Sequence, residues 1–371
     1  MKKFLTVVLA TLLCVSLLAG CGGSSSGGGA TSGGSTSSSF VKPANPLDLD
    51  FDAIDWSKQP EVRIIWAIAQ SANSAGGQNI TIAMGDIGEK TGGKVKFELS
   101  GDAVLVDEAG MLEALESGLC QIVKQTPSVN VGLIPELECL VYPGFFSGPL
   151  DRYEDFNRAI QGPIAAIYED HGFKQFSPNP TGTSAFLIKK QQVLKPDDLK
   201  GMLLRASGAS LAKVIEQYGA SSTVLGLGDV PTALDRGTID GMFSSSSMMV
   251  DMHFTEVANY MTVLTFREML GDYSMSQKWY DSLTPEMQAV LDYYGEVYLQ
   301  TVISRVDVLE MDNLLKAQGE GTSVVWLSAE ESKPFADALI PLFEDFGQRT
   351  SDKGRDLLKV IYEYNGWTWS F

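Results

Sequence analysis

The strongest constraint on the fold is a long helical pattern that begins at Thr284. Thr284 can cap a helix whose first residue is Pro285, and nothing interrupts the pattern until Gly319. Apolar side chains recur at helical spacing, at Met287, Val290, Leu291, Tyr294, Tyr298 and Val302. A helix of about 33 residues is about 50 Å long, longer than one small domain is wide. A continuous helix must therefore lie across two domains; the alternative is two shorter helices with a kink at Gly295 or near Asp307.

The rest of the chain alternates short apolar runs with helical segments. Strands are expected at residues 62–69, 95–99, 120–123, 173–176, 185–189, 203–206, 223–227 and 239–243, with helical patterns between most of them. Strands that alternate with helices indicate α/β layers with largely parallel sheets. Together with the long helix, this pattern predicts an α/β, two-lobed binding protein, in which one helix bridges both lobes and a ligand cleft lies between them.

The N-terminus has the composition of a secretory signal peptide, assigned to residues 1–20. Lys2 and Lys3 precede an apolar run of about fifteen residues, which is too short to span a bilayer comfortably. Leu18-Ala19-Gly20-Cys21 resembles the lipobox of bacterial lipoproteins, in which the Cys is acylated and becomes the new N-terminus. An ordinary signal peptide that happens to carry a Cys at this place is the alternative. Residues 22–39 are only Gly, Ser, Thr and Ala, so residues 21–58 are predicted to be a lipidated Cys and a flexible tether.

The charge of the chain excludes one class of partner. Removal of residues 1–20 would leave 26 basic and 46 acidic residues, a formal charge of −20. Such a surface repels nucleic acid and anionic lipid head groups, so we expect no nucleic-acid partner and membrane contact through the lipid anchor alone. The predicted location is extracytoplasmic, at the cell surface or in a periplasm.

Catalytic signatures are scarce. Neither G-x-S-x-G nor H-E-x-x-H occurs, and the two His, His171 and His253, are interpreted as structural. Asp48, Asp50 and Asp52 alternate like calcium ligands, but the closing Gly and Glu of such a loop are missing, so solvated acids are expected. We therefore predict no enzyme activity, no catalytic residue, no metal and no cofactor.

Two cysteines remain after the proposed cleavage and lipidation. Cys120 and Cys139 both lie in apolar, strand-like stretches. A disulfide could persist outside the cytoplasm, and two buried thiols are the other interpretation.

Arg205 is the most informative charged residue. It lies inside the apolar strand Met202–Ala206, where a charge needs a partner. A guanidinium suits two-point contact with a carboxylate, so Arg205 could bind an anionic ligand. An internal salt bridge or an exposed strand end would explain it equally well.

Five segments, taken in order along the chain, resemble the solute-binding proteins of TRAP transporters (tripartite, ATP-independent, periplasmic; the DctP type). They resemble the family's E-K-T-G-G-R-V turn, E-A-L-Q-x-G helix end, D-L-K-G-x-K-x-R strand, E-V-Y-x-A-L-Q-x-G-x-V-D-G segment and W-x-x-L-P-E helix entry. In this chain they are Glu89–Val95, Leu112–Gly118, Pro196–Arg205, Asp229–Gly241 and Trp279–Glu286. The resemblance is collinear from about Val62 to the C-terminal region. It implies two α/β lobes, a hinge, a long connecting helix and one anionic ligand in the cleft.

The resemblance also implies a set of ligand contacts. In this family the Arg at position 205 pairs with the ligand carboxylate. Relatives often carry a second Arg after Gly182, where this chain has Thr183 and Ser184. Other predicted contacts are Leu227, where relatives have an aromatic residue, Ser244, where they have Asn, together with Phe243, Gln125 and Asn73. With fewer charges and more apolar surface, the ligand is expected to be a small or aromatic monocarboxylate rather than a sugar acid or dicarboxylate.

The resemblance sets the expected domain organisation and partners. Lobe 1 is placed at residues 59–181, completed by about 268–308, and lobe 2 at 182–267, completed by about 309–371. The protein is expected to be a monomer that captures an organic acid and delivers it to the membrane permease subunits of a TRAP transporter. A ligand-sensing binding protein without a transport role is the alternative, which a neighbouring permease gene would disfavour.

Overall fold

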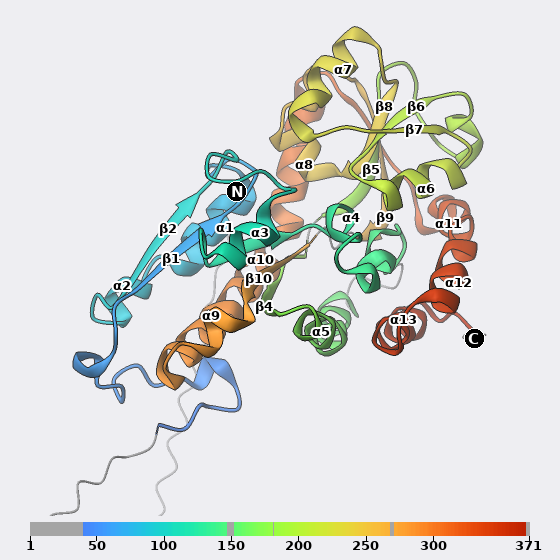
Figure 1. Ribbon diagram of the computed structural model, residues 1–371. Helices are drawn as coiled ribbons and strands as arrows, with labels where there is room; N and C mark the ends of the chain where they lie inside the picture. The colour runs from blue at the N-terminus through green and yellow to red at the C-terminus, as the bar shows by residue number, and fades with distance from the viewer. Residues whose placement is uncertain (1–39, 147–151, 181, 268–270, 369–371) are drawn as a thin grey trace, which may run out of the picture. The chain divides into compact units, whose positions relative to one another are not determined.

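The computed structural model describes residues 40–146, 152–180, 182–267 and 271–368, and it contains two mixed β-sheets (Figure 1). The signal peptide of residues 1–20 and the lipobox Cys21 lie outside the described residues. Within the described part of the chain, no helix is both long and apolar enough to cross a membrane.

The first sheet, sheet A, has the strand order β2-β1-β3-β10-β4. Its strands are β1 (Val62–Ala67), β2 (Val95–Ser100), β3 (Ile122–Gln125), β4 (Phe173–Pro178) and β10 (Asp272–Ser276). The pairs β1–β2 and β1–β3 are parallel, whereas β10 runs antiparallel to both β3 and β4. β10 therefore enters sheet A from a part of the chain that follows β5–β9, five of the six strands of the second sheet.

The second sheet, sheet B, has the strand order β11-β9-β5-β8-β6-β7. Its strands are β5 (Thr183–Ile188), β6 (Leu203–Ala206), β7 (Ser221–Val224), β8 (Gly241–Ser245), β9 (Tyr260–Arg267) and β11 (Ser323–Trp326). β6 pairs in parallel with β7 and β8, whereas β5 is antiparallel to β8 and β9. All six residues of the central strand β5 are buried, and the last four, Ala185–Ile188, are apolar.

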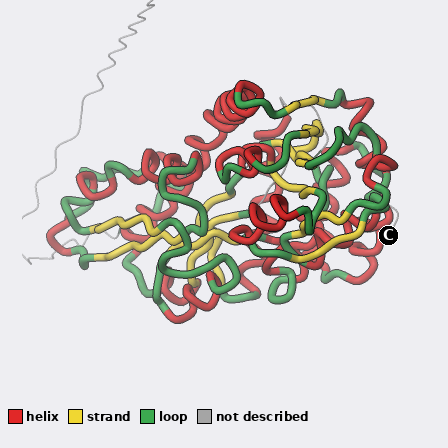
Figure 2. The backbone as a smooth tube through the Cα atoms, turned by 90° about the horizontal axis from the view of Figure 1, so that it is seen from above, coloured by secondary structure: helices red, strands yellow, loops and turns green. Residues whose placement is uncertain are grey.

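Helices flank the strands of each sheet (Figure 2). They are α1 (Ala75–Met84), α2 (Ile87–Lys90), α3 (Met111–Ser117), α4 (Pro127–Asn130), α5 (Tyr153–Asp170), α6 (Ala209–Gln217), α7 (Val230–Arg236), α8 (Ser246–Asp251), α9 (Gln277–Asp281), α10 (Pro285–Gly319), α11 (Ala329–Asp337), α12 (Ile340–Arg349) and α13 (Asp352–Asn365). One apolar cluster joins sheet A to α1 and α10, and another joins sheet B to α7, α8 and the far end of α10. The predicted α/β architecture with two lobes is confirmed.

The long helix α10 is a single element of 35 residues, so the alternative of two shorter helices is wrong. The Thr284 hydroxyl caps it by accepting the Met287 N–H at 3.3 Å, with Pro285 as its first residue. The helix continues through Gly295. The missing side chain there lets the helix approach β4 closely, since a Cβ on Gly295 would lie 2.3 Å from the Phe176 carbonyl oxygen. The helix packs on β4 near its start and on α8 and β11 near its end, so it contacts elements of both sheets.

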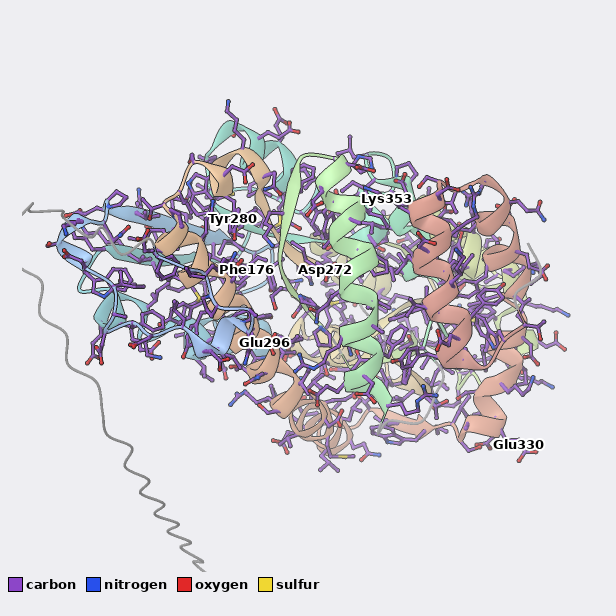
Figure 3. The ribbon with its side chains drawn as sticks, turned by 90° about the horizontal axis from the view of Figure 1, so that it is seen from below. Phe176, Asp272, Tyr280, Glu296, Glu330 and Lys353 are labelled. Atoms are coloured by element: carbon purple, nitrogen blue, oxygen red, sulfur yellow. The ribbon has the colours of Figure 1, made fainter. Side chains whose placement is uncertain are left out.

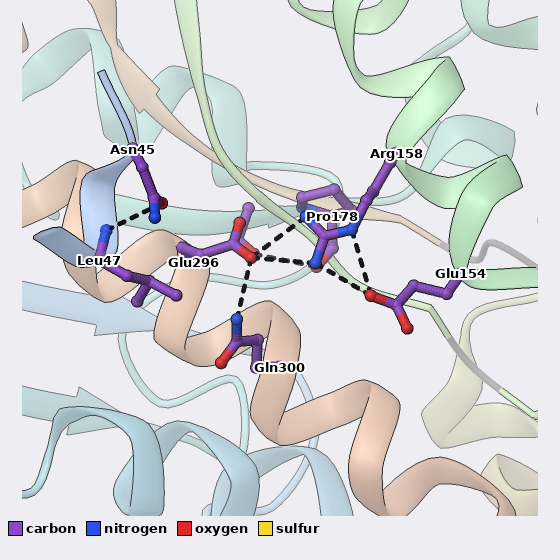
Figure 4. Close-up of polar contacts among 8 residues, drawn as sticks. Asn45, Leu47, Glu154, Arg158, Pro178, Glu296 and Gln300 are labelled. Carbon is purple, nitrogen blue, oxygen red and sulfur yellow. Dashed lines mark hydrogen bonds and ion pairs between the residues drawn. The ribbon is translucent and has the colours of Figure 1, made fainter. Parts of the chain in front are cut away.

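An ion pair adds to the contact between α10 and α5. The Arg158 guanidinium of α5 lies 3.3 Å from a Glu296 carboxylate oxygen of α10 and 3.0 Å from a Glu154 oxygen (Figure 4). The Gln300 amide donates to the same Glu296 oxygen at 3.3 Å. Arg158 and Glu154 are exposed and Glu296 is half-buried, so we expect the network to contribute only modestly to stability.

Residues 40–58, which were predicted to belong to the flexible tether, are folded. Two short 3-10 helices, η1 (Pro46–Asp48) and η2 (Trp56–Lys58), lie in this stretch. Leu49 and Ile54 are buried. The ring of Phe51 packs edge-to-face against that of Tyr293, with 5.0 Å between the ring centroids. The boundary at residue 58 is therefore too late, because apolar side chains from Phe40 onward pack on α10 and sheet A.

The C-terminal helices contact more than the second sheet. α13 packs along α5, and the Lys353 ammonium at its start donates to the Ala166 carbonyl of α5 at 2.8 Å (Figure 3). Because α5 lies on β4 of sheet A, the stretch assigned to lobe 2 also covers lobe 1.

Cys120 and Cys139 are buried free thiols, which agrees with the second of the two interpretations of these cysteines.

Candidate ligand site between the sheets

In each sheet, several strands start or end close to the segment that connects sheet A to sheet B. In sheet B, the parallel strands β6 and β8 end at Ala206 and Ser245, and the antiparallel strand β5 starts at the same edge with Thr183. In sheet A, β3 ends at Gln125, which lies opposite Asp272 at the start of β10. Residues 179–182 connect β4 of sheet A to β5 of sheet B. The strand ends that carry these polar residues therefore lie on the sides of the two sheets that face each other.

Arg205 lies on β6 at this edge and is 3% exposed. Its Nε donates to the Leu225 carbonyl oxygen at 2.9 Å, and no carboxylate of the described residues lies within ion-pair distance. Burial lowers the pKa of Arg205 to about 10, while the charge of Glu108 acts in the opposite direction. The guanidinium therefore stays charged at neutral pH, and the alternative of an internal salt bridge finds no partner among the described residues.

Glu108, whose charge acts on Arg205, and Ser207, two residues after Arg205, both contact the segment that follows β3. The Thr126 hydroxyl, which follows β3, donates to a Glu108 carboxylate oxygen at 2.5 Å. The Ser207 hydroxyl, two residues after Arg205, donates to the Ser128 hydroxyl of α4 at 2.8 Å. β6 and its following turn therefore face the segment that follows β3.

Two predicted serines lie at the same sheet edge. Ser244 of β8 is buried and lies two residues beyond Met242, the cross-strand partner of Arg205, so both point to one face. Ser184 of β5 pairs with Ser245 of β8, so it points to the face opposite Ser244 and Arg205. The Ser184 hydroxyl is fully buried and has no hydrogen-bond partner among the described residues. A buried hydroxyl without a partner can donate to or accept from a ligand.

The structure places the two predicted apolar contacts elsewhere. Phe243 is 1% exposed, and its ring lies 4.6 Å from that of Phe186 in an aromatic cluster of the core. It points to the face opposite Arg205, because neighbouring strand residues alternate. This corrects the expectation that Phe243 contacts the ligand. Leu227, in the short 3-10 helix Leu227–Asp229, is half-buried and packs against the cluster beneath α7 and α8.

Gln125 is fully buried and accepts a hydrogen bond from the Asn130 amide at 2.7 Å. Its own amide nitrogen has no partner among the described residues. Opposite it, Asp272 accepts from the Tyr168 hydroxyl at 3.2 Å, and burial raises the pKa of Asp272 to about 7 (Figure 3). These polar groups lie inside sheet A, next to the connection to sheet B.

A cavity of about 380 Å³ lies between the sheets. Sheet A contributes Lys124 and Tyr273, and sheet B contributes Ser245. The rest of the wall comes from α1, α8 and α10 and from the loops before α1, between β4 and β5, and after α8. Of the seven predicted ligand contacts, only Asn73 lines this cavity. Arg205 and Ser244 do not line it, although Ser245, which follows Ser244 in β8, does.

The cavity contains charged residues that sequence reasoning missed. Asp251 at the end of α8 accepts from the Asn313 amide of α10 at 3.0 Å, and burial raises its pKa. Lys316 of α10 and His253 also line the wall, although His253 was interpreted as structural. A signal existed for the α10 residues: Leu309, Asn313 and Lys316 recur at helical spacing beyond the part of the helix whose apolar face was analysed.

No group of three or more His, Cys, Asp or Glu that could hold a metal occurs in the described part of the chain. The chemistry between the sheets is instead that of hydrogen bonds and isolated charges. Such a site can bind and orient a small polar anion.

Comparison with known proteins identifies the family. The model of the bacterial extracellular solute-binding protein family 7, DctP, matches residues 71–350. The chain belongs to this family. Family 7 members are solute-binding proteins rather than enzymes, and they act outside the cytoplasm.

Relatives of the chain in family 7 include two ectoine-binding proteins. The ectoine-binding periplasmic protein TeaA of Halomonas elongata is 23% identical over 67% of this chain and 74% of its own length. The ectoine/5-hydroxyectoine-binding periplasmic protein UehA of Ruegeria pomeroyi is 24% identical over 69% of this chain and 77% of its own length.

Solved structures of the family share the fold. A TRAP periplasmic solute-binding protein from Anaerococcus prevotii with bound d-glucuronate has a TM-score of 0.74 at 22% identity, covering 82% of this chain and 99% of its own. An extracytoplasmic solute receptor of Bordetella pertussis that binds pyroglutamic acid has a TM-score of 0.72 at 19% identity, with coverage of 81% and 99%. At these identities the likeness establishes the two-lobed fold.

Proposed function

We propose that the protein captures a small organic acid between its two sheets and delivers it to the permease subunits of a TRAP transporter. The observation that carries the proposal is Arg205, a buried guanidinium with only a backbone carbonyl as its acceptor among the described residues. A buried charge with unused donors is costly unless a ligand supplies the missing acceptors. Relatives named for ectoine, glucuronate or pyroglutamate, all of which contain a carboxylate, support this class of ligand.

The lack of a second Arg at the start of β5 favours a ligand with one carboxylate. β5 offers Thr183 and Ser184 where relatives have a second Arg, so a second carboxylate has no matching guanidinium there. The position of Phe243 in the core removes the argument for an aromatic ligand. Amides and hydroxyls of the cavity, such as those of Asn73 and Ser71, suit a ligand with polar groups beyond its carboxylate. Far tighter binding of succinate than of any monoacid would contradict this choice.

Replacement of Arg205 tests the carboxylate contact. A ligand that binds only the folded state raises its stability by RT ln(1 + [L]/Kd), about 2.7 kcal/mol at a hundredfold excess over Kd. We expect pyroglutamate, d-glucuronate or another acid of a melting screen to raise the Tm of the wild type. Arg205→Ala should lose this response, with affinity lower by about a hundredfold or more, and Arg205→Lys should recover only part of it because it lacks the planar fork.

The matched control is Arg63→Ala, which removes an exposed Arg that pairs with Glu98. It should bind as the wild type does. An Arg205→Ala protein that keeps the wild-type affinity would refute the assigned role, and the Tm of each unliganded variant shows whether the fold is intact.

We further propose that lipidation of Cys21 tethers the receptor to the membrane. The lipobox-like sequence and the Gly/Ser-rich residues 22–39 support this arrangement. A tether keeps the receptor at high effective concentration near its permease. Metabolic labelling with a fatty-acid analogue should mark the wild type and not Cys21→Ser; equal labelling of both would contradict the anchor.

We propose that lobe 1 is residues 59–181, completed by about 268–308 and extended at its start by the folded residues 40–58, and that lobe 2 is 182–267, completed by about 309–371. β9 belongs to sheet B and the next strand, β10, belongs to sheet A. This supports the proposal that the chain returns from lobe 2 to lobe 1 near residue 268. The protein is proposed to act as a monomer, which light scattering of the mature chain would test.

A further inference from the structure

A buried carboxylate stands out on the long helix. Glu310 of α10 is 4% exposed, although it lies in the stripe that includes the apolar residues Val306, Leu314 and Ala317. A carboxylate in such a place is costly unless hydrogen bonds hold it. Its position on the helix that contacts both sheets makes its partners informative.

Those partners come from two strand ends of sheet B. Oε1 of Glu310 accepts the backbone N–H of Thr183 at 2.7 Å, and it accepts the Thr183 hydroxyl as well. The Ser246 hydroxyl donates to the same oxygen at 2.5 Å. Charge-assisted hydrogen bonds of this kind are about twice as strong as neutral ones.

The bonded residues frame the candidate ligand site. Thr183 starts β5 and Ser246 follows the end of β8, and their neighbours Ser184 and Ser245 are cross-strand partners. Gly182, next to Thr183, and Ser245, next to Ser246, both line the cavity. On α10, Leu309 and Asn313 beside Glu310 line it too. Glu310 thus lies behind the point where β5, β8 and α10 join to form the cavity wall.

Close packing shows that this junction is built around the carboxylate. A Cβ on Gly182 would lie 2.7 Å from Oε1 of Glu310 and 2.8 Å from its carboxyl carbon. A residue with a side chain at position 182 would therefore push the carboxylate away from Thr183. The sequence Gly182-Thr183 supplies both the space and the donors.

We propose that Glu310 is a positioning residue for ligand binding. It fixes the starts of β5 and α8 against the long helix, so that the cavity wall keeps the shape that receives the ligand. This inference rests on the proposed function, because it assigns a role in binding at that site. Without the negative charge, the three hydrogen bonds to the Glu310 oxygen lose their charge assistance, and β5 and α8 can move apart at the wall.

The test combines Glu310→Gln with a matched control on the same helix. Asp312→Asn also removes one carboxylate from α10, but its side chain is exposed. In the unliganded proteins, we expect amide hydrogen exchange of peptides covering residues 182–188 and 245–251 to rise at least tenfold in Glu310→Gln only. Peptides of β1 and β2 should stay at the wild-type rate in both variants.

Binding is measured by titration with pyroglutamate, d-glucuronate and succinate. The acid that binds the wild type most tightly should bind Glu310→Gln at least tenfold more weakly and Asp312→Asn equally well. Thr183→Ser keeps the hydroxyl and should match the wild type, whereas Thr183→Val and Ser246→Ala should each weaken binding. If Glu310→Gln does not fold, Thr183→Val and Ser246→Ala test the same role of Glu310, because each removes a donor to its carboxylate.

The outcomes separate the inference from the proposed function. Unchanged hydrogen exchange at the two strand ends overturns the inference, as does wild-type affinity in a Glu310→Gln protein whose exchange has risen. Failure of the wild type to bind any of the three acids contradicts the proposed function itself.

Discussion

At the scale of single residues, Arg205 and Phe243 show what a sequence can and cannot reveal about the surroundings of a side chain. Arg205 could be singled out because a guanidinium within an apolar strand is unusual under any fold. Phe243 could not be placed, because the face to which a strand residue points changes with a shift of one position. The motif fixed its place in the chain, but only the register with Phe186 shows that it faces the core.

Asp272 provides a prediction for the dependence of stability on pH. Its folded pKa is raised to about 7 by burial, so the folded state holds a proton that the unfolded state has released. Stability from this group is full below the unfolded pKa and is lost as the pH rises from about 4 to about 7. We expect Asp272→Asn to be more stable than the wild type at pH 8, by about 2–4 kcal/mol.

Urea denaturation of both proteins at pH 4.5 and pH 8 measures this difference, which should shrink at the lower pH. Comparison with the variant isolates Asp272 from the other carboxyl groups. Equal stability of the two proteins at pH 8 would show that the buried carboxyl is not destabilised there.

At the scale of elements, the long helix was predictable and the packing around it was not. Its cap at Thr284 and its apolar spacing are local features of the sequence. By contrast, the segment from Phe40 to Lys58 was assigned to the tether because it follows a Gly/Ser-rich run. Its folding depends on contacts with residues far along the chain, such as that of Phe51 with Tyr293, which no local pattern reveals.

Glu138 joins three elements, and its removal should be costly. It lies in the 3-10 helix η3 (Pro135–Val141) and accepts from Lys213 of α6 at 3.0 Å, from Arg349 of α12 at 2.5 Å and from the Tyr142 hydroxyl at 2.9 Å. Its pKa is lowered, since these hydrogen bonds outweigh the opposing effect of burial. We expect Glu138→Gln to reduce the free energy of unfolding by about 1–3 kcal/mol at pH 7.

A group with a lowered pKa stabilises the fold above its unfolded pKa, and this stability is lost as the pH falls through the folded pKa. The difference between Glu138→Gln and the wild type in urea should therefore narrow below about pH 4. Asp356→Asn, which removes an exposed partner of Lys359, serves as the control and should change stability little. Similar losses in both variants would contradict a special role for Glu138.

At the scale of the whole molecule, the two-lobed fold followed from five motifs in order, whereas the distance between the lobes could not be predicted. In the structure they approach closely where α6 meets α4. Gly208 has extended backbone geometry, yet a Cβ on it would lie 2.0 Å from the Ser128 carbonyl oxygen. The sequence shows a Gly before a helix, and only the fold shows that the other lobe lies against it.

Gly208→Ala should therefore hold the lobes apart at this contact. The extended backbone accepts Ala, so we expect the unliganded protein to fold and the ligand affinity to fall about tenfold or more, because overpacking costs about 1–3 kcal/mol in the closed arrangement. Small-angle scattering of the liganded protein should show a larger radius of gyration than that of the wild type. Gly162→Ala, with nothing within 4 Å of its added Cβ, is the control. A Gly208→Ala protein with wild-type radius and affinity would contradict this role.

The folded start of the chain has a mechanical consequence. The Lys42 ammonium donates to the Tyr280 hydroxyl of α9 at 2.8 Å and forms an ion pair with Asp292 of α10. A pull on the residues before Phe40 would therefore load α9, the first turns of α10 and the apolar contacts with sheet A. Sheet B is reached through the far end of α10, which packs on α8 and β11. Under the proposed tethering, drag on the receptor would enter through the lobe of sheet A and pass to the other lobe along the long helix.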